Sequence, residues 1–253
     1  MSTSTGYDEM HDGGGDIRPH YRSYARWLDA QPADMLRTRH EEAEQIFRRV
    51  GITFAVYGDK DEGGAGTERL IPFDLIPRII RRDEWREMEA GLVQRVTALN
   101  RFLHDVYHGQ EILKAGVVPA DQVLRNAQYR PEMAGVDVPC DMYASIAGID
   151  MVRAPDETGQ GRYYVLEDNL RVPSGVSYML ENRKMMMRLF PSLFGMQRVA
   201  PVAHYPDLLL ETLGALAPAA GDEPTVVVLT PGIYNSAYIE HAFLAQQMGV
   251  ELV

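Results

Sequence analysis

Three residues in the middle of the chain could together bind a metal ion: Asp150, Glu167 and Asn169. They lie on two β-branched and aromatic segments, 148–153 and 163–169, which flank a run of turn-forming residues. This pattern predicts a β-hairpin. Strand alternation places Asn169 on the same face as Glu167. Two carboxylates and an amide oxygen are suitable ligands for a hard divalent cation such as Mg²⁺, which keeps other coordination sites for water and phosphate oxygens.

The turn between the two segments predicts how the strands pair. If the hairpin is symmetric about residues 158–159, Val152 pairs with Val165 and Asp150 pairs with Glu167. Like charges directly opposite each other are destabilising unless something between them compensates. A bound cation would compensate for them. The alternative is an exposed hairpin whose acidic side chains are simply solvated.

The residues after the second segment indicate an anion site. Ser174 is a predicted N-cap of a helix that begins near Gly175 or Val176 and ends before Pro191. The free amides and the dipole at a helix N-terminus favour an anion. Arg171 adds a positive charge whose fork geometry suits phosphate or carboxylate. Metal ligands beside an anion site describe a centre that binds nucleotide phosphates.

The same residues carry a resemblance to a known family. Asp150 followed by LEDNLRVPSGVSYMLENR at 166–183 closely resembles the signature of the circularly permuted ATP-grasp type 2 family, relatives of glutathionylspermidine synthetase. The resemblance continues in RPHY at 18–21, GITFAVYGD at 51–59, ERLIPFDLIPRII at 68–80 and TPGIYNSAYIEHAFLAQQMGVEL at 230–252. It covers nearly the whole chain, and the central motif is long enough to be specific.

This resemblance implies an α/β (α+β) fold: part of a circularly permuted ATP-grasp domain with an antiparallel metal-binding hairpin, and a Rossmann-like pre-ATP-grasp βαβ start. It implies an ATP-dependent ligase that joins a small-molecule or peptide carboxylate to an amine through an acyl phosphate. Mg²⁺ would bridge the ATP phosphates from Asp150, Glu167 and Asn169. Arg171, with the amides near Ser174 and Gly175, would hold the phosphate or the carboxylate. The family has a Pro-Thr-Ser type turn at the position of residues 173–175, so the role of Ser174 is the least defined.

The composition bounds the class of protein. The 253 residues are 45% hydrophobic, enough for a substantial core. The net charge is −11 and the pI is about 5.1, which argues against nucleic acid or an anionic membrane as the main partner. A single cysteine excludes an internal disulfide. The first residues are polar and no run approaches a membrane span, so we expect a soluble, cytoplasmic protein.

The chain divides into three expected parts. Residues 1–20 are polar and glycine-rich and are expected to form a flexible tail. Residues 21–200 are expected to hold a helical region and the metal-binding part of the ATP-grasp domain. Residues 201–253 are expected to begin a pre-ATP-grasp-like α/β domain, and we expect the chain to be truncated inside it. The alternative function is a non-catalytic module, left by truncation of such a ligase, that binds a peptide or protein partner.

Several elements are predicted around the hairpin. Residues 31–50 have the spacing of an amphipathic helix. The segment from Lys60 predicts a flexible turn. A buried parallel strand is expected at 225–230, with a helix over 236–248 after it. The loop and helix after that strand offer Asn235, Ser236, Glu240 and His241 as candidate ligand contacts.

A longer helix is predicted from Asp83, which is the expected N-cap. Its apolar residues recur at three- and four-residue steps and predict a stripe that faces the core. The members of the stripe are Trp85, Met88, Leu92, Val96, Leu99, Leu103 and Val106.

Overall fold

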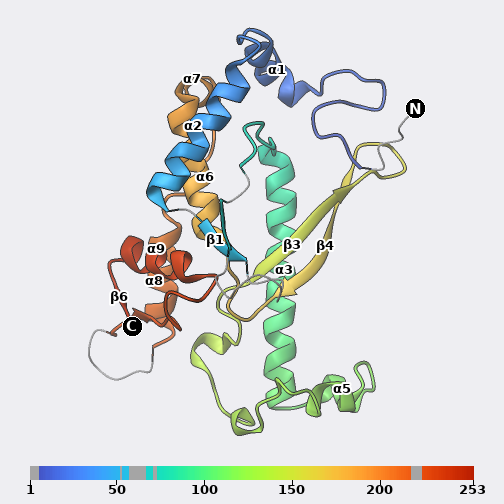
Figure 1. Cartoon of the computed structure of the whole chain (residues 1–253). Coiled ribbons are helices and arrows are strands. Elements are labelled where there is room, and N and C mark those ends of the chain that lie inside the picture. Colours follow the sequence, from blue (N-terminus) through green and yellow to red (C-terminus); the bar gives the residue numbers. More distant parts are fainter. Residues whose placement is uncertain (1–5, 52, 57–66, 71–72, 218–223) are drawn as a thin grey trace.

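The structure is a computed structural model, and it describes residues 6–51, 53–56, 67–70, 73–217 and 224–253. Within these ranges the chain is a mixed helix and sheet protein, as predicted (Figure 1). The helices are α1 (Arg22–Asp29), α2 (Met35–Val50), α3 (Arg82–Tyr107), α4 (Glu111–Lys114), α5 (Ala120–Leu124), α6 (Val176–Leu189), α7 (Pro191–Met196), α8 (Tyr205–Ala215) and α9 (Tyr238–Met248). The strands are β1 (Thr53–Val56), β2 (Thr67–Leu70), β3 (Gly148–Ala154), β4 (Arg162–Asn169), β5 (Val227–Val228) and β6 (Glu251–Leu252).

The described strands form three two-stranded sheets. The pairs β1–β2 and β3–β4 are antiparallel, and the pair β5–β6 is parallel with α9 between its strands in the sequence. The predicted helix over 236–248 is present as α9. The turn predicted from Lys60 lies largely outside the described residues. No helix of the described ranges combines the length and the apolar character needed to cross a membrane.

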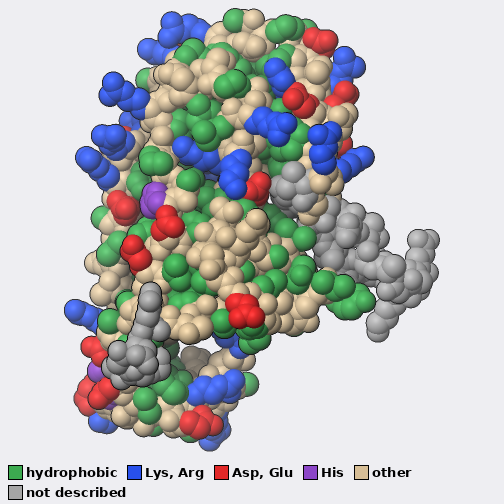
Figure 2. Space-filling view, turned by 90° about the vertical axis from the view of Figure 1, so that its left-hand side faces the viewer, with side chains coloured by type: hydrophobic (Ala, Val, Ile, Leu, Met, Phe, Trp, Pro, Cys, Tyr) green, Lys and Arg blue, Asp and Glu red, His purple; other side chains and the backbone are tan. Residues whose placement is uncertain are grey.

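The hydrophobic core lies among α1, α2, α6 and α7, which are side by side in Figure 1. The predicted amphipathic helix at 31–50 is α2, and its apolar face enters this core. On the face shown in Figure 2, Lys and Arg side chains gather at the upper end, over this layer of helices. The buried core residues are Tyr21, Tyr24, Ala43, Phe47, Phe73, Leu75, Met185, Met186, Leu189, Phe190 and Leu193.

Helix α3 differs from its prediction in two ways. Its N-cap is Arg81, and Asp83 lies in the first turn instead of capping the helix. Of the predicted core-facing stripe only Val106 is buried, and Trp85 is 50% exposed. The remaining apolar residues of the stripe are half-buried because α3 runs beside the β3–β4 hairpin (Figure 1), and a cavity lies between the two.

A buried asparagine joins α3 to the segment that leads into β3. The side-chain oxygen of Asn100 accepts hydrogen bonds from the amides of Tyr143 and Ala144, both at 2.8 Å. Its amide nitrogen donates to the carbonyls of Val96 and Ala144. Asn100 is 8% exposed, so these bonds are largely shielded from water. One side chain therefore satisfies two backbone donors just before the hairpin.

We expect Asn100→Ala to lower the free energy of unfolding by about 2 kcal/mol, because two buried backbone amides would lose their acceptor. Urea unfolding followed by circular dichroism would measure the loss. Thr97→Ala is a matched control on an exposed position of α3, where we expect a change within about 0.5 kcal/mol. An equal loss in the two variants would contradict the bridging role of Asn100.

Candidate functional site

The predicted hairpin is present, and its acidic residues oppose each other. β3 and β4 pair in antiparallel fashion, with Asp150 directly opposite Glu167, as predicted. The predicted pairing of Val152 with Val165 is wrong, because Val152 lies opposite Tyr164. The register shifts by one residue between Asp150 and Met151, so β4 carries one extra residue there. This irregularity is a β-bulge.

The bulge decides which side chains face α3. Residues directly opposite in an antiparallel pair share a face. Val165 therefore lies on the α3 side with its partner Met151, and both line the cavity there. After the extra residue, Asp168 returns to the α3 side, where it forms an ion pair with Arg95 of α3. Glu167 remains with Asp150 on the outer face. In an unbulged strand Glu167 would share the face of Val165 instead.

The three predicted metal ligands converge on this outer face. The amide nitrogen of Asn169 lies 3.1 Å from the Oε1 atom of Glu167. Burial raises the pKa of the Asp150 carboxyl. The hydrogen bond to Glu167 and the negative charge of Glu167 raise this pKa further. Two crowded carboxylates and an adjacent amide are a donor set that fits a hard divalent cation. Within the described residues, no group of three or more His, Cys, Asp or Glu side chains is placed to hold a metal. The set at this site consists of two carboxylates and one amide.

Arg171 follows β4 in a turn whose next residue, Val172, has a φ of 48° and is 81% exposed. The Nη1 atom of Arg171 donates a hydrogen bond to the side-chain oxygen of Gln128 at 2.7 Å. Arg171 is exposed and forms no ion pair within the described ranges. The connector before β3 therefore holds the guanidinium by a neutral contact and leaves its charge uncompensated.

The N-terminus of α6 is occupied by the chain itself. Ser174 is not the N-cap, so that prediction is wrong: the N-cap is Gly175, with a φ of 109° and no side-chain cap. The amide of Gly175 donates to both carboxylate oxygens of Glu240 at 2.8 Å. The amide and hydroxyl of Ser177 donate to its Oε2 atom at 3.2 and 2.6 Å. Glu240 comes from α9 and is 4% exposed. It therefore supplies the anion that the helix dipole favours.

Two of the other candidates near the C-terminus, Asn235 and His241, have local partners. The side-chain oxygen of Asn235 accepts a hydrogen bond from the amide of Ala237 at 2.9 Å. The Nδ1 atom of His241 lies 2.8 Å from the hydroxyl of Thr230. These contacts order the loop before α9. Among the four candidates of this region, Glu240 makes the long-range contact, and it reaches the turn that follows the hairpin.

A buried arginine fixes the other end of the hairpin. Arg153 of β3 forms ion pairs with Glu9 at 2.9 Å and with Glu84 of α3 at 2.6 Å. Its guanidinium carbon lies 4.3 Å from the ring centre of Tyr7 and 5.1 Å from that of Tyr163. The Arg153 side chain is 9% exposed. From residue 6 onward, the segment expected to be a flexible tail therefore has defined contacts with the hairpin.

Comparisons with known proteins agree with the resemblance seen in the sequence. A family model described as a circularly permuted ATP-grasp matches residues 77–253. An uncharacterized protein of Synechocystis sp. is 48% identical over 247 residues, which are 98% of this chain and 50% of that protein. An uncharacterized protein of Mycobacterium tuberculosis is 44% identical over 98% of this chain and 43% of its own length.

A further relative carries an enzyme name. A protein of Frankia casuarinae, provisionally named glutamate–cysteine ligase 2-2, is 42% identical over 252 residues, which are 98% of this chain and 28% of that protein. The chain thus spans half or less of the length of these curated relatives.

Proposed function

Because the chain belongs to the circularly permuted ATP-grasp family, we propose that it contributes the metal- and phosphate-binding part of an ATP-dependent ligase. The observation that carries the proposal is the outward-facing pair of Asp150 and Glu167 with Asn169 beside it. Opposed carboxylates at adjacent strand positions are destabilising without a cation. In this family the natural use of such a cation is to bind ATP phosphates.

We propose that the reaction joins a carboxylate to an amine. The γ-phosphoryl group of ATP would pass to a carboxylate oxygen of the substrate, and ADP would leave. The amine nitrogen would then attack the acyl carbon, the bond to the phosphate oxygen would break, and an amide and phosphate would form. A Mg²⁺ ion at the outer face would supply charge neutralisation for the transferred group. Asp150, Glu167 and Asn169 are the residues that would hold it.

The residues after β4 would orient the reacting groups. Arg171 is the proposed contact to the phosphate or to the substrate carboxylate, because its charge is uncompensated within the described ranges. The Ser174 side chain forms no hydrogen bond within the described ranges, and its hydroxyl could donate one to the phosphate or to the substrate carboxylate. The amide of Gly175 is engaged by Glu240, which makes Gly175 a residue that fixes the turn in this structure. This changes its expected role from a phosphate contact to a support.

For the substrates we propose only a chemical class. The Frankia relative is named for a ligation of two amino acids, and the glutathionylspermidine synthetase subtype joins a peptide carboxylate to an amine. Both names share a small-molecule or peptide carboxylate and an amine, and we propose that class here, with a cytoplasmic location where ATP is available. We also propose that residues 21–200 hold an N-terminal helical region and the metal-binding part of the ATP-grasp domain, and that residues 201–253 belong to a pre-ATP-grasp-like α/β domain.

We expect Glu167→Gln to weaken the binding of Mg²⁺-ATP by at least about 100-fold, since losing a direct metal ligand should cost no less than losing a residue that only orients one. Its free energy of unfolding should be unchanged or higher, because the opposed charge is removed. Isothermal titration of the 253-residue chain measures the affinity. Glu157→Gln is the matched control, since it removes the same charge from the exposed turn of the same hairpin.

Two outcomes would contradict the proposal. Equal affinities for the parent chain and Glu167→Gln would show that the metal is held elsewhere. A folded parent chain that binds no Mg²⁺-ATP would show that these residues alone do not form a nucleotide site.

A further inference from the structure

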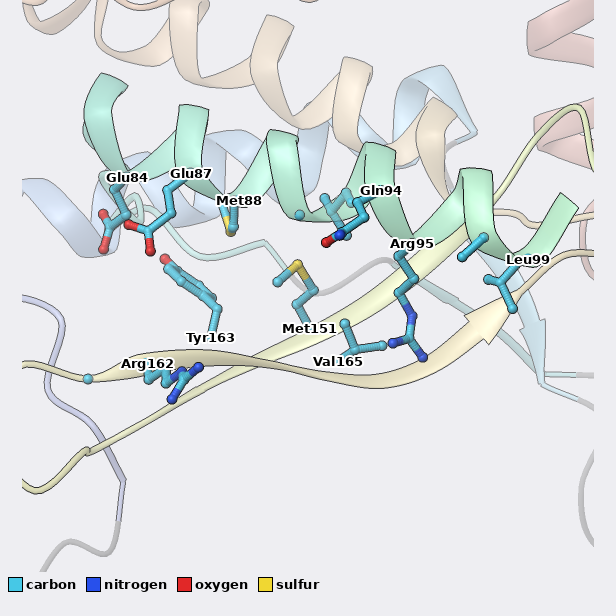
Figure 3. Close-up of a pocket in the computed structure, with 14 residues that line it drawn as sticks. Glu84, Glu87, Met88, Gln94, Arg95, Leu99, Met151, Arg162, Tyr163 and Val165 are labelled. Carbon is cyan, nitrogen blue, oxygen red and sulfur yellow. The ribbon is translucent and has the colours of Figure 1, made fainter. Parts of the chain in front are cut away.

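A cavity of about 740 Å³ lies between α3 and the inner face of the β3–β4 hairpin (Figure 3). Its volume is in the range that small-molecule sites occupy. Met88, Leu92 and Leu99 of α3 form one wall, and Met151 and Val165 of the hairpin form the other. In Figure 3 the thioether of Met151 points across the cavity toward α3. Apart from Gln94, the middle of the cavity is therefore lined by apolar side chains that could contact an aliphatic chain.

One end of this cavity is rich in hydrogen-bond acceptors. Glu84, Glu87 and Tyr163 line it, and Figure 3 shows the Tyr163 hydroxyl pointing toward the two carboxylates. The Oε2 atom of Glu84 and the hydroxyl of Tyr163 are buried without a hydrogen-bond partner in the described part of the chain. Glu87 is exposed and forms no ion pair there. Unpaired buried polar atoms are costly, and the unpaired oxygen of Glu84 can only accept, so a donor is expected beside it.

The charges of the cavity select the kind of donor. Arg153 pairs with one oxygen of Glu84 and leaves the other free. At the far end, the positive charge of Arg95 is neutralised by Asp168. Burial, and then the charge of Glu84, raises the pKa of Tyr163, so its hydroxyl stays protonated but can still accept a hydrogen bond. Arg162 also lines the cavity, but its guanidinium carbon lies 6.0 Å from the ring centre of Tyr164, which is on the outer face of β4. The charges that face into this end of the cavity are therefore the carboxylates of Glu84 and Glu87.

We propose that this cavity binds a primary alkylammonium, with its three N–H groups directed to Glu84, Glu87 and Tyr163 and its aliphatic chain along Met88 and Met151. An ammonium group offers three donors and no acceptor, which matches the acceptors at this end. The site lies on the opposite face of the hairpin from Asp150 and Glu167, so it does not depend on the proposed metal site. An occupant would link α3 to β4, the strand that carries Glu167.

The probe is n-hexylammonium, compared with the neutral n-hexanol. In a chain labelled with ¹³C at its methionine methyls, we expect n-hexylammonium to shift the NMR signals of Met88 and Met151, assigned from Met→Leu variants. The exposed Met196 of α7 should not shift. We expect n-hexylammonium to bind about 10-fold more tightly than n-hexanol, because hydrogen bonds between charged groups are stronger than those of a neutral hydroxyl.

Substitutions locate the charged end. Glu87→Gln should weaken n-hexylammonium binding about 10-fold and leave n-hexanol binding unchanged. Glu89→Gln is the matched control, because this acid lies on the same helix but does not line the cavity. Tyr163→Phe provides a second test at the same end without a change of charge. Equal affinity of the chain for n-hexylammonium and n-hexanol would overturn the proposal, because it would show an apolar packing surface without selection for an ammonium group. An absence of shifts at Met88 and Met151 would overturn it as well, because it would show that the probe does not enter the cavity.

Discussion

Arg153→Ala is expected to lower the free energy of unfolding by about 3–5 kcal/mol, the range for breaking a buried ion pair by removing one partner. Arg153 lies between Glu9 and Glu84, whose side chains are 17% and 11% exposed. Without the guanidinium, two poorly solvated carboxylates would face each other. The ring of Tyr163 would also lose its contact with this cation, and the ring of Tyr7 would keep only Arg18. Urea unfolding at neutral pH would measure the loss.

The controls separate charge from packing. Arg162→Ala removes an exposed arginine from the neighbouring strand and should change stability by no more than about 0.5 kcal/mol. Combining Arg153→Met with Glu9→Gln and Glu84→Gln should recover much of the loss, because no buried charge would remain unpaired; Arg78, which also pairs with Glu9, is exposed to water. A loss for Arg153→Ala as small as that of Arg162→Ala would mean that water already solvates this cluster.

Glu240→Ala is expected to cost about 3 kcal/mol, because it leaves the amides of Gly175 and Ser177 and the Ser177 hydroxyl without their acceptor at a buried helix end. Hydrogen exchange should show the first amides of α6 opening before the rest of the helix. Glu240→Gln keeps an acceptor oxygen but loses the charge that the helix dipole favours, so it should lie between the parent and Glu240→Ala.

A smaller change at the same contact provides the comparison. Ser177→Ala removes only the hydroxyl donor and keeps the backbone amide of this residue, and we expect a loss of about 1 kcal/mol. If Glu240→Ala cost no more than Ser177→Ala, the backbone amides of α6 would be satisfied in another way. Urea unfolding of the three variants under identical conditions makes this comparison.

The local parts of the candidate site were predictable from the sequence. The turn formers at 154–161 and the β-branched segments around them are enough to predict the hairpin, but Asp150 lies opposite Glu167 as predicted only because the bulge offsets a one-residue error in the predicted register near the turn. The start of α6 near Val176 also follows from its local pattern. The family follows from a long motif, and a family model matches residues 77–253. In each case the information lies within a few residues of the feature.

The parts that failed depend on contacts between distant residues. Ser174 is a residue type that often caps a helix, but the amide of Gly175 donates instead to the carboxylate of Glu240, which lies 65 residues further along the chain. Leu166 fits an ordinary strand pattern, so nothing local reveals the bulge. The apolar stripe of α3 has the period of a core-facing helix, but a period cannot tell how much of a face a neighbouring hairpin covers.

The extra residue in β4 also affects how the family can be aligned. Removing Leu166 would delete the one residue of β4 that has no partner at this point: Val165 would still lie opposite Met151 and Glu167 opposite Asp150, and the ladder would become regular. A single-residue deletion at this point would thus keep Glu167 and Asn169 on the face of Asp150. Relatives that lack one residue here can therefore present the same acidic pair, and a gap in their alignment with this chain belongs at Leu166.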